Sequence, residues 1–247
     1  MITSSELRKP AQGPASFATT QWTIVLAAAG AGSTAADAAL AQLCQRYWYP
    51  LYAYVRRCGN STHAAEDLTQ EYFARLLHKK TLADVDRDKG KFRSFLLATL
   101  KHFLANEYDR AHTVKRGGNR AIVSLDAGTA DSRYRLEPSH DLTPEKLFER
   151  RWALAVLEHV LARLGDEQVA AGKQTLFEHL KPFLTADRST MNYAQVAGDL
   201  EMTEGAVKVA LHRLRKRYRE LLRDEIGQTV SNPAEIDEEI QYLRSCL

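Results

Sequence analysis

The chain has 247 residues, 45% of them hydrophobic, so it can bury one large core or two small ones. Its net charge of +3 says little about partners, and its three cysteines form no CxxC pair, which argues against a disulfide framework or a zinc site and indicates a reducing cytoplasm. No apolar run approaches the length of a membrane span. Because residues that favour helices are frequent and Val, Ile and Thr runs are scarce, we expect an all-α protein.

The first part of the chain predicts one helical domain at residues 19–116, which follows a disordered tail of residues 1–18. Gly59 suits the cap of a helix that ends just before it. Apolar side chains that recur every three or four residues indicate three main helices in this domain, over 37–57, 62–79 and 92–112.

The second of these helices has two distinct faces. An apolar stripe should be buried and comprises Ala65, Leu68, Tyr72 and Leu76. Asp67, Gln70 and Glu71 share another face, which is either an ordinary solvated surface or a site for Arg and Gln side chains of a partner. Paired carboxylates also suit acid–base catalysis, but no second carboxylate pair, metal-type His cluster or nucleophile accompanies them. We therefore expect no enzyme activity, no metal and no cofactor.

The third helix leads into a basic stretch and then into a linker. Lys101, Arg110, Lys115 and Arg116 can neutralise nucleic-acid phosphates. Residues 117–142 contain Gly, Ser and Asp without a sustained period, and they are long for a loop inside a compact domain. We interpret them as a flexible linker between two helical domains.

The second domain is predicted at residues 143–226, and an acidic helical extension follows at residues 227–247. Thr143 is a good N-cap with Pro144 at the first helical position, and Asn232 with Pro233 repeats that arrangement in the extension. The intervening helices are expected over 144–164, 173–185, 193–200 and 204–226. The charge of the extension raises the hypothesis that it covers a basic surface of the same chain.

Residues 193–226 have the pattern of a helix-turn-helix. Ala197 supplies the small side chain that two closely crossing helices need, and Thr203 can cap the second helix. Glu201 stands in the turn where Gly is usual because the backbone there prefers positive φ. The inward stripe of the second helix is expected to comprise Val207, Leu211, Leu214, Tyr218 and Leu221.

The outer face of that second helix is basic, which favours DNA binding over an ordinary surface hairpin. The side chains expected in a major groove are Thr203, Glu204, Ala206, Lys208 and His212. Those expected at phosphates or groove edges are Arg213, Arg215 and Lys216.

Taken together, the two halves resemble the extracytoplasmic-function (ECF) group of bacterial RNA polymerase sigma factors, over 37–115 and 145–225. The stretch Asp67-Leu-Thr-Gln-Glu-Tyr-Phe73 is similar to the DxxQxxF motif of the family, whose helix docks on the clamp helices of the polymerase β′ subunit. The resemblance implies that core polymerase is bound by Asp67, Gln70, Glu71 and Phe73.

Residues 92–110 resemble the helix of that family that reads and melts the minus-ten promoter element. The DNA contacts expected on and after this helix are Arg93, Lys101, Asn106, Arg110, Lys115 and Arg116. Core packing is the alternative role of Phe92, Phe95 and Phe103, and we favour it for at least two of the three. The helix-turn-helix matches the region that reads the minus-thirty-five element.

The resemblance implies a sigma factor that binds the β and β′ subunits of core polymerase and directs initiation at promoter DNA without chemistry of its own. It leaves an anti-sigma factor open as a further partner, and no membrane or small-molecule substrate is expected. The rival interpretation is a stand-alone helix-turn-helix regulator, and an enzyme is a distant third.

Overall fold

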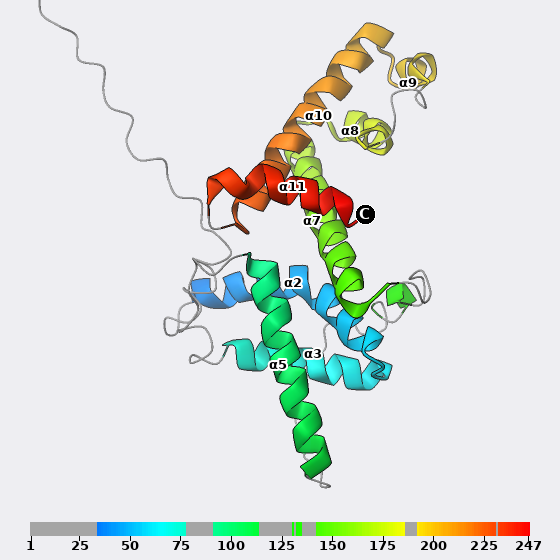
Figure 1. The fold of residues 1–247 in the computed structure, drawn as a ribbon. Coiled ribbons are helices and arrows are strands. Elements are labelled where there is room, and N and C mark those ends of the chain that lie inside the picture. Colours follow the sequence, from blue (N-terminus) through cyan, green and yellow to red (C-terminus); the bar gives the residue numbers. More distant parts are fainter. Residues whose placement is uncertain are drawn as a thin grey trace, which may run out of the picture.

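The computed structural model describes residues 34–77, 91–113, 130, 132–134, 142–185, 192–230 and 232–247. Within these residues every regular element is a helix, so the all-α prediction is confirmed (Figure 1). The first group of helices is α2 (Thr34–Arg57), α3 (Thr62–Leu77) and α5 (Phe92–Thr113). The second group is α7 (Pro144–Ala170), α8 (Gln174–Leu180), η2 (Lys181–Phe183), α9 (Tyr193–Asp199), α10 (Glu204–Gly227), η4 (Pro233–Glu235) and α11 (Ile236–Ser245). The expected tail over 1–18 and most of the linker over 117–142 lie outside the described residues.

Side-chain caps fix where several helices begin. The Thr143 hydroxyl accepts a hydrogen bond from the Lys146 amide at 3.3 Å, and Pro144 occupies the first turn of α7. The Asn232 side chain caps η4 in the same way, with Pro233 next to it. These starts are set by local chemistry, and the predictions for them are confirmed.

The first three helices pack into a unit with an aromatic core. Tyr47 on α2 meets Phe92 on α5 edge-on, with ring centroids 5.4 Å apart. The Tyr72 hydroxyl on α3 donates to the carbonyl of Leu96 on α5 at 3.0 Å, so even the polar end of this ring is satisfied in the core. Phe103 is buried and Phe95 packs against the core, which confirms core packing for at least two of the three phenylalanines.

Helix α7 joins this unit to the helix-turn-helix. It packs along α2 at one end and against α10 at the other, and Phe148 and Trp152 on its inner face are buried. The buried residues of both groups form one continuous hydrophobic cluster. The two predicted domains are therefore in direct contact in this conformation, while the boundaries assigned to them stay a prediction.

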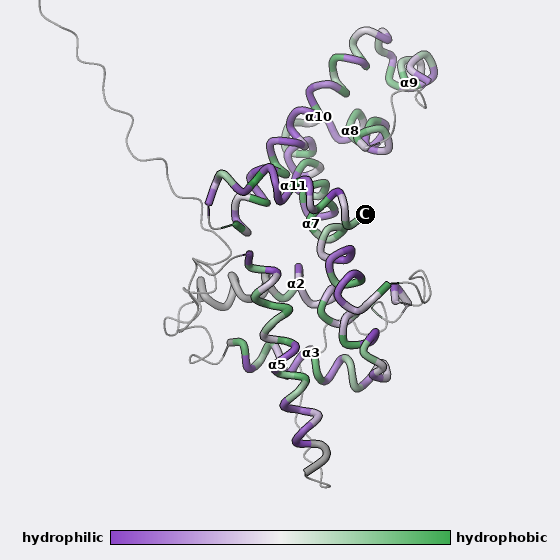
Figure 2. The backbone as a smooth tube through the Cα atoms, viewed as in Figure 1, coloured by the Kyte–Doolittle hydropathy of each residue, from purple (hydrophilic) through white to green (hydrophobic). Residues whose placement is uncertain are grey.

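The outer parts of the molecule are more hydrophilic than its centre. The far half of α5 extends beyond the other helices and is hydrophilic, as is much of α10 (Figures 1 and 2). The free end of α5 and the N-terminal end of α10 lie at opposite ends of the molecule (Figure 1). Helix α11 lies across α10 and α7 between these ends and buries Leu243 beneath it.

Candidate polymerase and nucleic-acid interfaces

The polar face of α3 is available to a partner. Asp67 is exposed, and Gln70 and Glu71 are half-buried at positions one turn further along the same face. The exposed Ala74 continues this face. The predicted stripe of two carboxylates and an amide is therefore present as a surface. We call Asp67, Gln70, Glu71 and Ala74 the α3 polar face.

A single arginine holds this face in place against α5. Arg75 donates to Glu71 at 2.8 Å and also forms an ion pair with Glu107 at 2.8 Å. Its guanidinium lies 4.9 Å from the centre of the Phe103 ring. Desolvation opposes the charge of Arg75, but hydrogen bonds to both carboxylates overcome it and raise its pKa. Glu71 is thus partly occupied by Arg75, whereas no ion pair of Asp67 is seen among the residues that the structure describes.

Phe73 is placed differently from the expectation that it forms part of the polymerase-binding surface. Its side chain is buried and meets the Tyr72 ring edge-on at 5.7 Å. It therefore holds α3 on the core and leaves the contact surface to its polar neighbours. The spacing of the motif does not distinguish core packing from partner contact, because a phenylalanine at this position of the helix is compatible with either role.

The middle and far parts of α5 present polar side chains. Lys101 forms an ion pair with Glu145 on α7 at 2.7 Å, which lowers the pKa of that carboxyl. Asn106 is exposed, and Arg110 is exposed but bonded to Glu107 at 2.9 Å. These exposed pairs contribute little to stability and can exchange for phosphate. Lys115 and Arg116 lie outside the described residues.

Arg93 departs most from its predicted role as a DNA contact. It is only 6% exposed, because its guanidinium bonds to Glu239 of α11 and lies between two aromatic rings. The centre of the Trp152 ring is 4.8 Å away and that of Tyr242 is 4.2 Å away. In this conformation Arg93 cannot reach DNA. Its partner is 146 residues distant in the chain, so no local pattern could reveal the pairing.

The turn of the helix-turn-helix has the backbone that its sequence predicts. Glu201 has φ of 52° and is the one non-glycine residue with positive φ among the described residues. Its amide donates to Gly198, and the next amide, of Met202, donates to Ala197 at 2.9 Å. These two bonds are those of a Schellman motif, which closes α9 and reverses the chain into α10.

The core beneath the turn is also as predicted. Ala197 is buried where the two helices cross, and Thr203 caps α10 by accepting from the Ala206 amide at 3.2 Å. All five residues of the expected inward stripe are buried, namely Val207, Leu211, Leu214, Tyr218 and Leu221. These contacts set how α9 and α10 cross, while the assignment of the pair as a DNA-binding helix-turn-helix stays a prediction.

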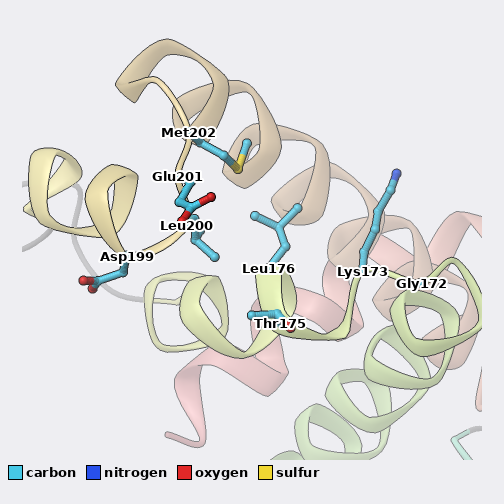
Figure 3. A pocket seen from close by; sticks show the side chains of 8 residues that line it. All are labelled: Gly172, Lys173, Thr175, Leu176, Asp199, Leu200, Glu201 and Met202. Carbon is cyan, nitrogen blue, oxygen red and sulfur yellow. The ribbon is translucent and has the colours of Figure 1, made fainter.

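An open pocket of about 380 Å³ separates this turn from α8. Its lining includes Leu176, Leu200 and Met202, whose side chains extend into the space between α8 and the turn (Figure 3). Asp199 points away from it (Figure 3). The three apolar side chains at the edge of this pocket also pack against the hydrophobic core.

Most side chains predicted to contact DNA from α10 lie on an exposed surface. Lys208 forms a 3.6 Å ion pair with Glu204 and lies 5.0 Å from the centre of the Tyr193 ring. Ala206 is half-buried beside this surface. The exposed members of the predicted set are Thr203, Glu204, Lys208, His212, Arg213 and Lys216.

Arg215, which was predicted to contact DNA, instead makes a contact within the protein. Its Nε and Nη2 atoms donate to the carbonyl of Phe183 at 3.2 and 2.7 Å, so it fixes η2 to α10. Arg217, which the sequence did not single out, braces α10 on α7 through two bonds to Glu167 at 2.8 and 2.7 Å. These two arginines hold α10 against η2 and α7. Their places in the sequence, next to the apolar stripe, are shared by the exposed His212 and Arg213, so the sequence pattern alone does not separate the two roles.

A buried charged cluster at the base of α10 was also missed. Glu225 is 1% exposed and lies 2.6 Å from Arg46 of α2 and 3.4 Å from Arg163 of α7. Arg46 also bonds to Nε2 of His159 at 2.7 Å. Burial, and then the Arg46 guanidinium, lower the pKa of His159, so this imidazole stays neutral and accepts the hydrogen bond. The cluster ties together three helices from both halves of the chain.

Comparison with known proteins gives one result for this fold. Residues 43–113 match the family model for sigma-70 region 2, which covers the end of α2, all of α3 and all of α5. No curated protein and no solved structure matches the chain. Where the structure describes the chain, none of its helices is both long and apolar enough to cross a bilayer, and no group of three potential metal ligands comes together.

Proposed function

Because residues 43–113 match sigma-70 region 2, which supports a sigma-70 family sigma factor, we propose that this chain is an ECF-group sigma factor that directs initiation at promoters with two recognition elements. The region 2 match is the observation that carries the proposal. In it, core polymerase is bound by the first group of helices, and the chain performs no chemistry of its own.

The α3 polar face is the proposed docking site for core polymerase. It lies within the matched segment, and Asp67 and Gln70 occupy it without a strong intramolecular partner among the described residues. Carboxylates of this kind pair well with arginine side chains of a partner. Phe73 supports the face from the core.

The exposed basic surface at the start of α10 is the proposed reader of the upstream element. Support comes from a helix-turn-helix geometry with Lys208, His212 and Arg213 exposed on one surface. The polar half of α5 is the proposed reader of the downstream element, through Lys101, Asn106 and Arg110. Their placement at opposite ends of the molecule suits two separated DNA elements (Figure 1).

Neither DNA surface is large, so each alone should bind weakly. Polymerase that holds both at the correct spacing makes the second contact intramolecular, which raises the overall affinity without new contacts. Strand opening then costs unstacking and unpairing energy, which captured single-strand bases and polymerase contacts offset.

A selection of bound sequences from random DNA duplexes tests this proposal. Holoenzyme formed with this chain should enrich two short motifs at a fixed spacing, whereas the chain alone should enrich none strongly. Tight selection of one motif by the chain alone, unchanged by core polymerase, would favour the stand-alone regulator and overturn the proposal.

A further inference from the structure

The C-terminal helix α11 makes contacts that a simple packing helix does not need. Its apolar side chains Ile236, Ile240 and Leu243 pack against the core, which explains why it folds back onto α10 and α7. The same helix also inserts an acidic side chain, Glu239, which is 1% exposed. Burial of a carboxylate is costly unless it is paired, so its partners matter.

Those partners are the first cations of α5. Glu239 bonds to the guanidinium of Arg93 and forms an ion pair with Lys91 at 2.6 Å. Tyr242, one turn later on α11, covers the Arg93 guanidinium at 4.2 Å. Burial, and then the Glu149 carboxylate on α7, raise the pKa of the Tyr242 hydroxyl, so this residue also ties α11 to α7. Arg93 is thus buried between α11 and α7, while Lys91 is held by Glu239 and stays partly exposed.

Two further contacts hold the same segment. The Phe92 amide at the start of α5 donates to the carbonyl of Thr229, just after α10, at 3.3 Å. On the outer side, Arg223 of α10 bonds to Asp237 of α11. The C-terminal segment therefore joins the start of α5 to the end of α10.

Without α11, the start of α5 would be an anion-binding surface. Removal of Glu239 and Tyr242 would leave Lys91 and Arg93 beside the N-terminus of α5, with Arg93 still against the Trp152 ring. Two cations at a helix N-terminus are suited to phosphate, and a carboxylate bonded to arginine is the closest protein equivalent of a phosphate. Glu239 thus stands in for the phosphate that this surface would bind.

We propose that residues 232–247 are an intramolecular latch, in which Glu239 occupies a backbone-phosphate site formed by Lys91 and Arg93 that DNA takes over when α11 is displaced. The DNA-binding role rests on the proposed function, but the competition between α11 and DNA is a separate claim. In this proposal, displacement of α11 exposes Arg93, which can then make the DNA contact that is blocked in the closed conformation.

A point substitution is a better test than deletion, because deletion would also expose the apolar residues that α11 covers. Glu239→Gln in the full-length chain removes the charge and keeps the size. Glu238→Gln, one residue earlier and exposed, is the matched control. The probe is a fluorescein-labelled, mixed-sequence DNA duplex, and its affinity is measured by anisotropy over a range of salt concentrations.

Glu239→Gln should bind the duplex roughly tenfold more tightly than the control at low salt. The reason is that DNA phosphate no longer competes with one or two charge-assisted contacts from Glu239 to Lys91 and Arg93. The slope of log affinity against log salt should steepen by about 1 to 2, since each additional phosphate contact contributes about 0.9. Arg93→Gln added to Glu239→Gln should remove most of the gain. Equal affinity of the two single variants would overturn the latch.

Amide hydrogen exchange gives a second measurement on the unmodified chain. Saturation with the duplex should reduce the protection of residues 236–245, and unchanged protection would overturn the latch. Asp237→Asn removes the exposed ion pair with Arg223 and should also weaken the protection of α11, even if Glu239→Gln folds poorly. If the chain directs transcription while the α11 amides stay protected from exchange, the latch alone is refuted. If the chain fails to bind core polymerase, the proposed function alone is refuted.

Discussion

Arg46 on α2 and Glu225 on α10 form a 2.6 Å ion pair although 179 residues separate them in the chain. Glu225 is almost fully buried, and Arg163 and His159 of α7 complete its surroundings. This cluster joins the helices that match sigma-70 region 2 to the base of the helix-turn-helix. The relative position of the two proposed DNA-reading surfaces therefore depends on the buried Glu225 carboxylate, whose arginine partners come together only in the folded chain.

Glu225→Gln should lower the free energy of unfolding by about 3 kcal/mol, because it leaves Arg46 and Arg163 without their buried counter-charge. Urea denaturation measures this change. The exposed neighbour Asp224 provides the matched control, and Asp224→Asn should change stability by less than about 0.5 kcal/mol. Similar losses in the two variants would show that the Glu225 cluster does not hold the helices together.

His159 should make the stability of the chain depend on pH. Its lowered pKa means that the folded chain resists a proton that the unfolded chain accepts. Stability from this group is therefore complete above the unfolded pKa of about 6.5 and falls as the pH drops through that value, until the folded imidazole is itself protonated.

The measurement is the free energy of unfolding of wild type and His159→Gln at successive pH values from neutral to mildly acidic. The variant should lose part of the acid-side slope. His212→Gln, at an exposed position on α10, is the control for loss of a histidine side chain. A wild-type slope in His159→Gln would contradict the assignment of a neutral, hydrogen-bonded imidazole.

Glu201→Gly should stabilise the helix-turn-helix by about 1 kcal/mol, since φ of 52° strains every residue with a Cβ. Glu201→Ala keeps a Cβ and should gain little. Thermal denaturation of the two variants separates backbone strain from loss of the carboxylate. An equal gain in both would mean that the glutamate charge, and not the backbone, is the unfavourable feature.

The α3 polar face and its buried neighbour should respond differently to substitution. Asp67→Ala combined with Gln70→Ala should weaken binding of core polymerase while the unfolding curve stays close to that of wild type, because Asp67 is exposed and the buried Oε1 of the half-buried Gln70 makes no hydrogen bond within the described residues. Phe73→Ala should instead cost about 3 kcal/mol or more of stability, as truncation of a buried aromatic ring does.

Binding of labelled chain to core polymerase, measured by anisotropy, checks the first part and urea denaturation checks the second. Glu178→Ala, an exposed carboxylate on α8, is the control for loss of surface charge. If the double variant binds as tightly as this control, the α3 polar face is not the docking site.

The helices and their caps could be predicted because local chemistry determines them. Thr143, Asn232 and Thr203 each supply a side-chain oxygen at the start of a helix. Glu201 departs from the glycine usual in the turn, yet its φ is positive as the pattern requires. Neighbouring residues suffice to define each of these features.

The roles of individual charged residues were less predictable, because they depend on distant partners. Arg93 was expected at DNA but is enclosed by Glu239, and Arg215 was expected at DNA but holds η2. Glu225 gave no signal at all, since its partners lie on two other helices. A basic residue on a helix has the same local pattern in either role, so only the tertiary structure separates them.

The most direct test of the central claim is run-off transcription with purified core RNA polymerase and a promoter obtained by sequence selection with the holoenzyme. The account predicts a discrete transcript that requires this chain and is strongly reduced by the Asp67→Ala, Gln70→Ala double variant. A chain that binds the promoter tightly on its own and never directs initiation would contradict the account.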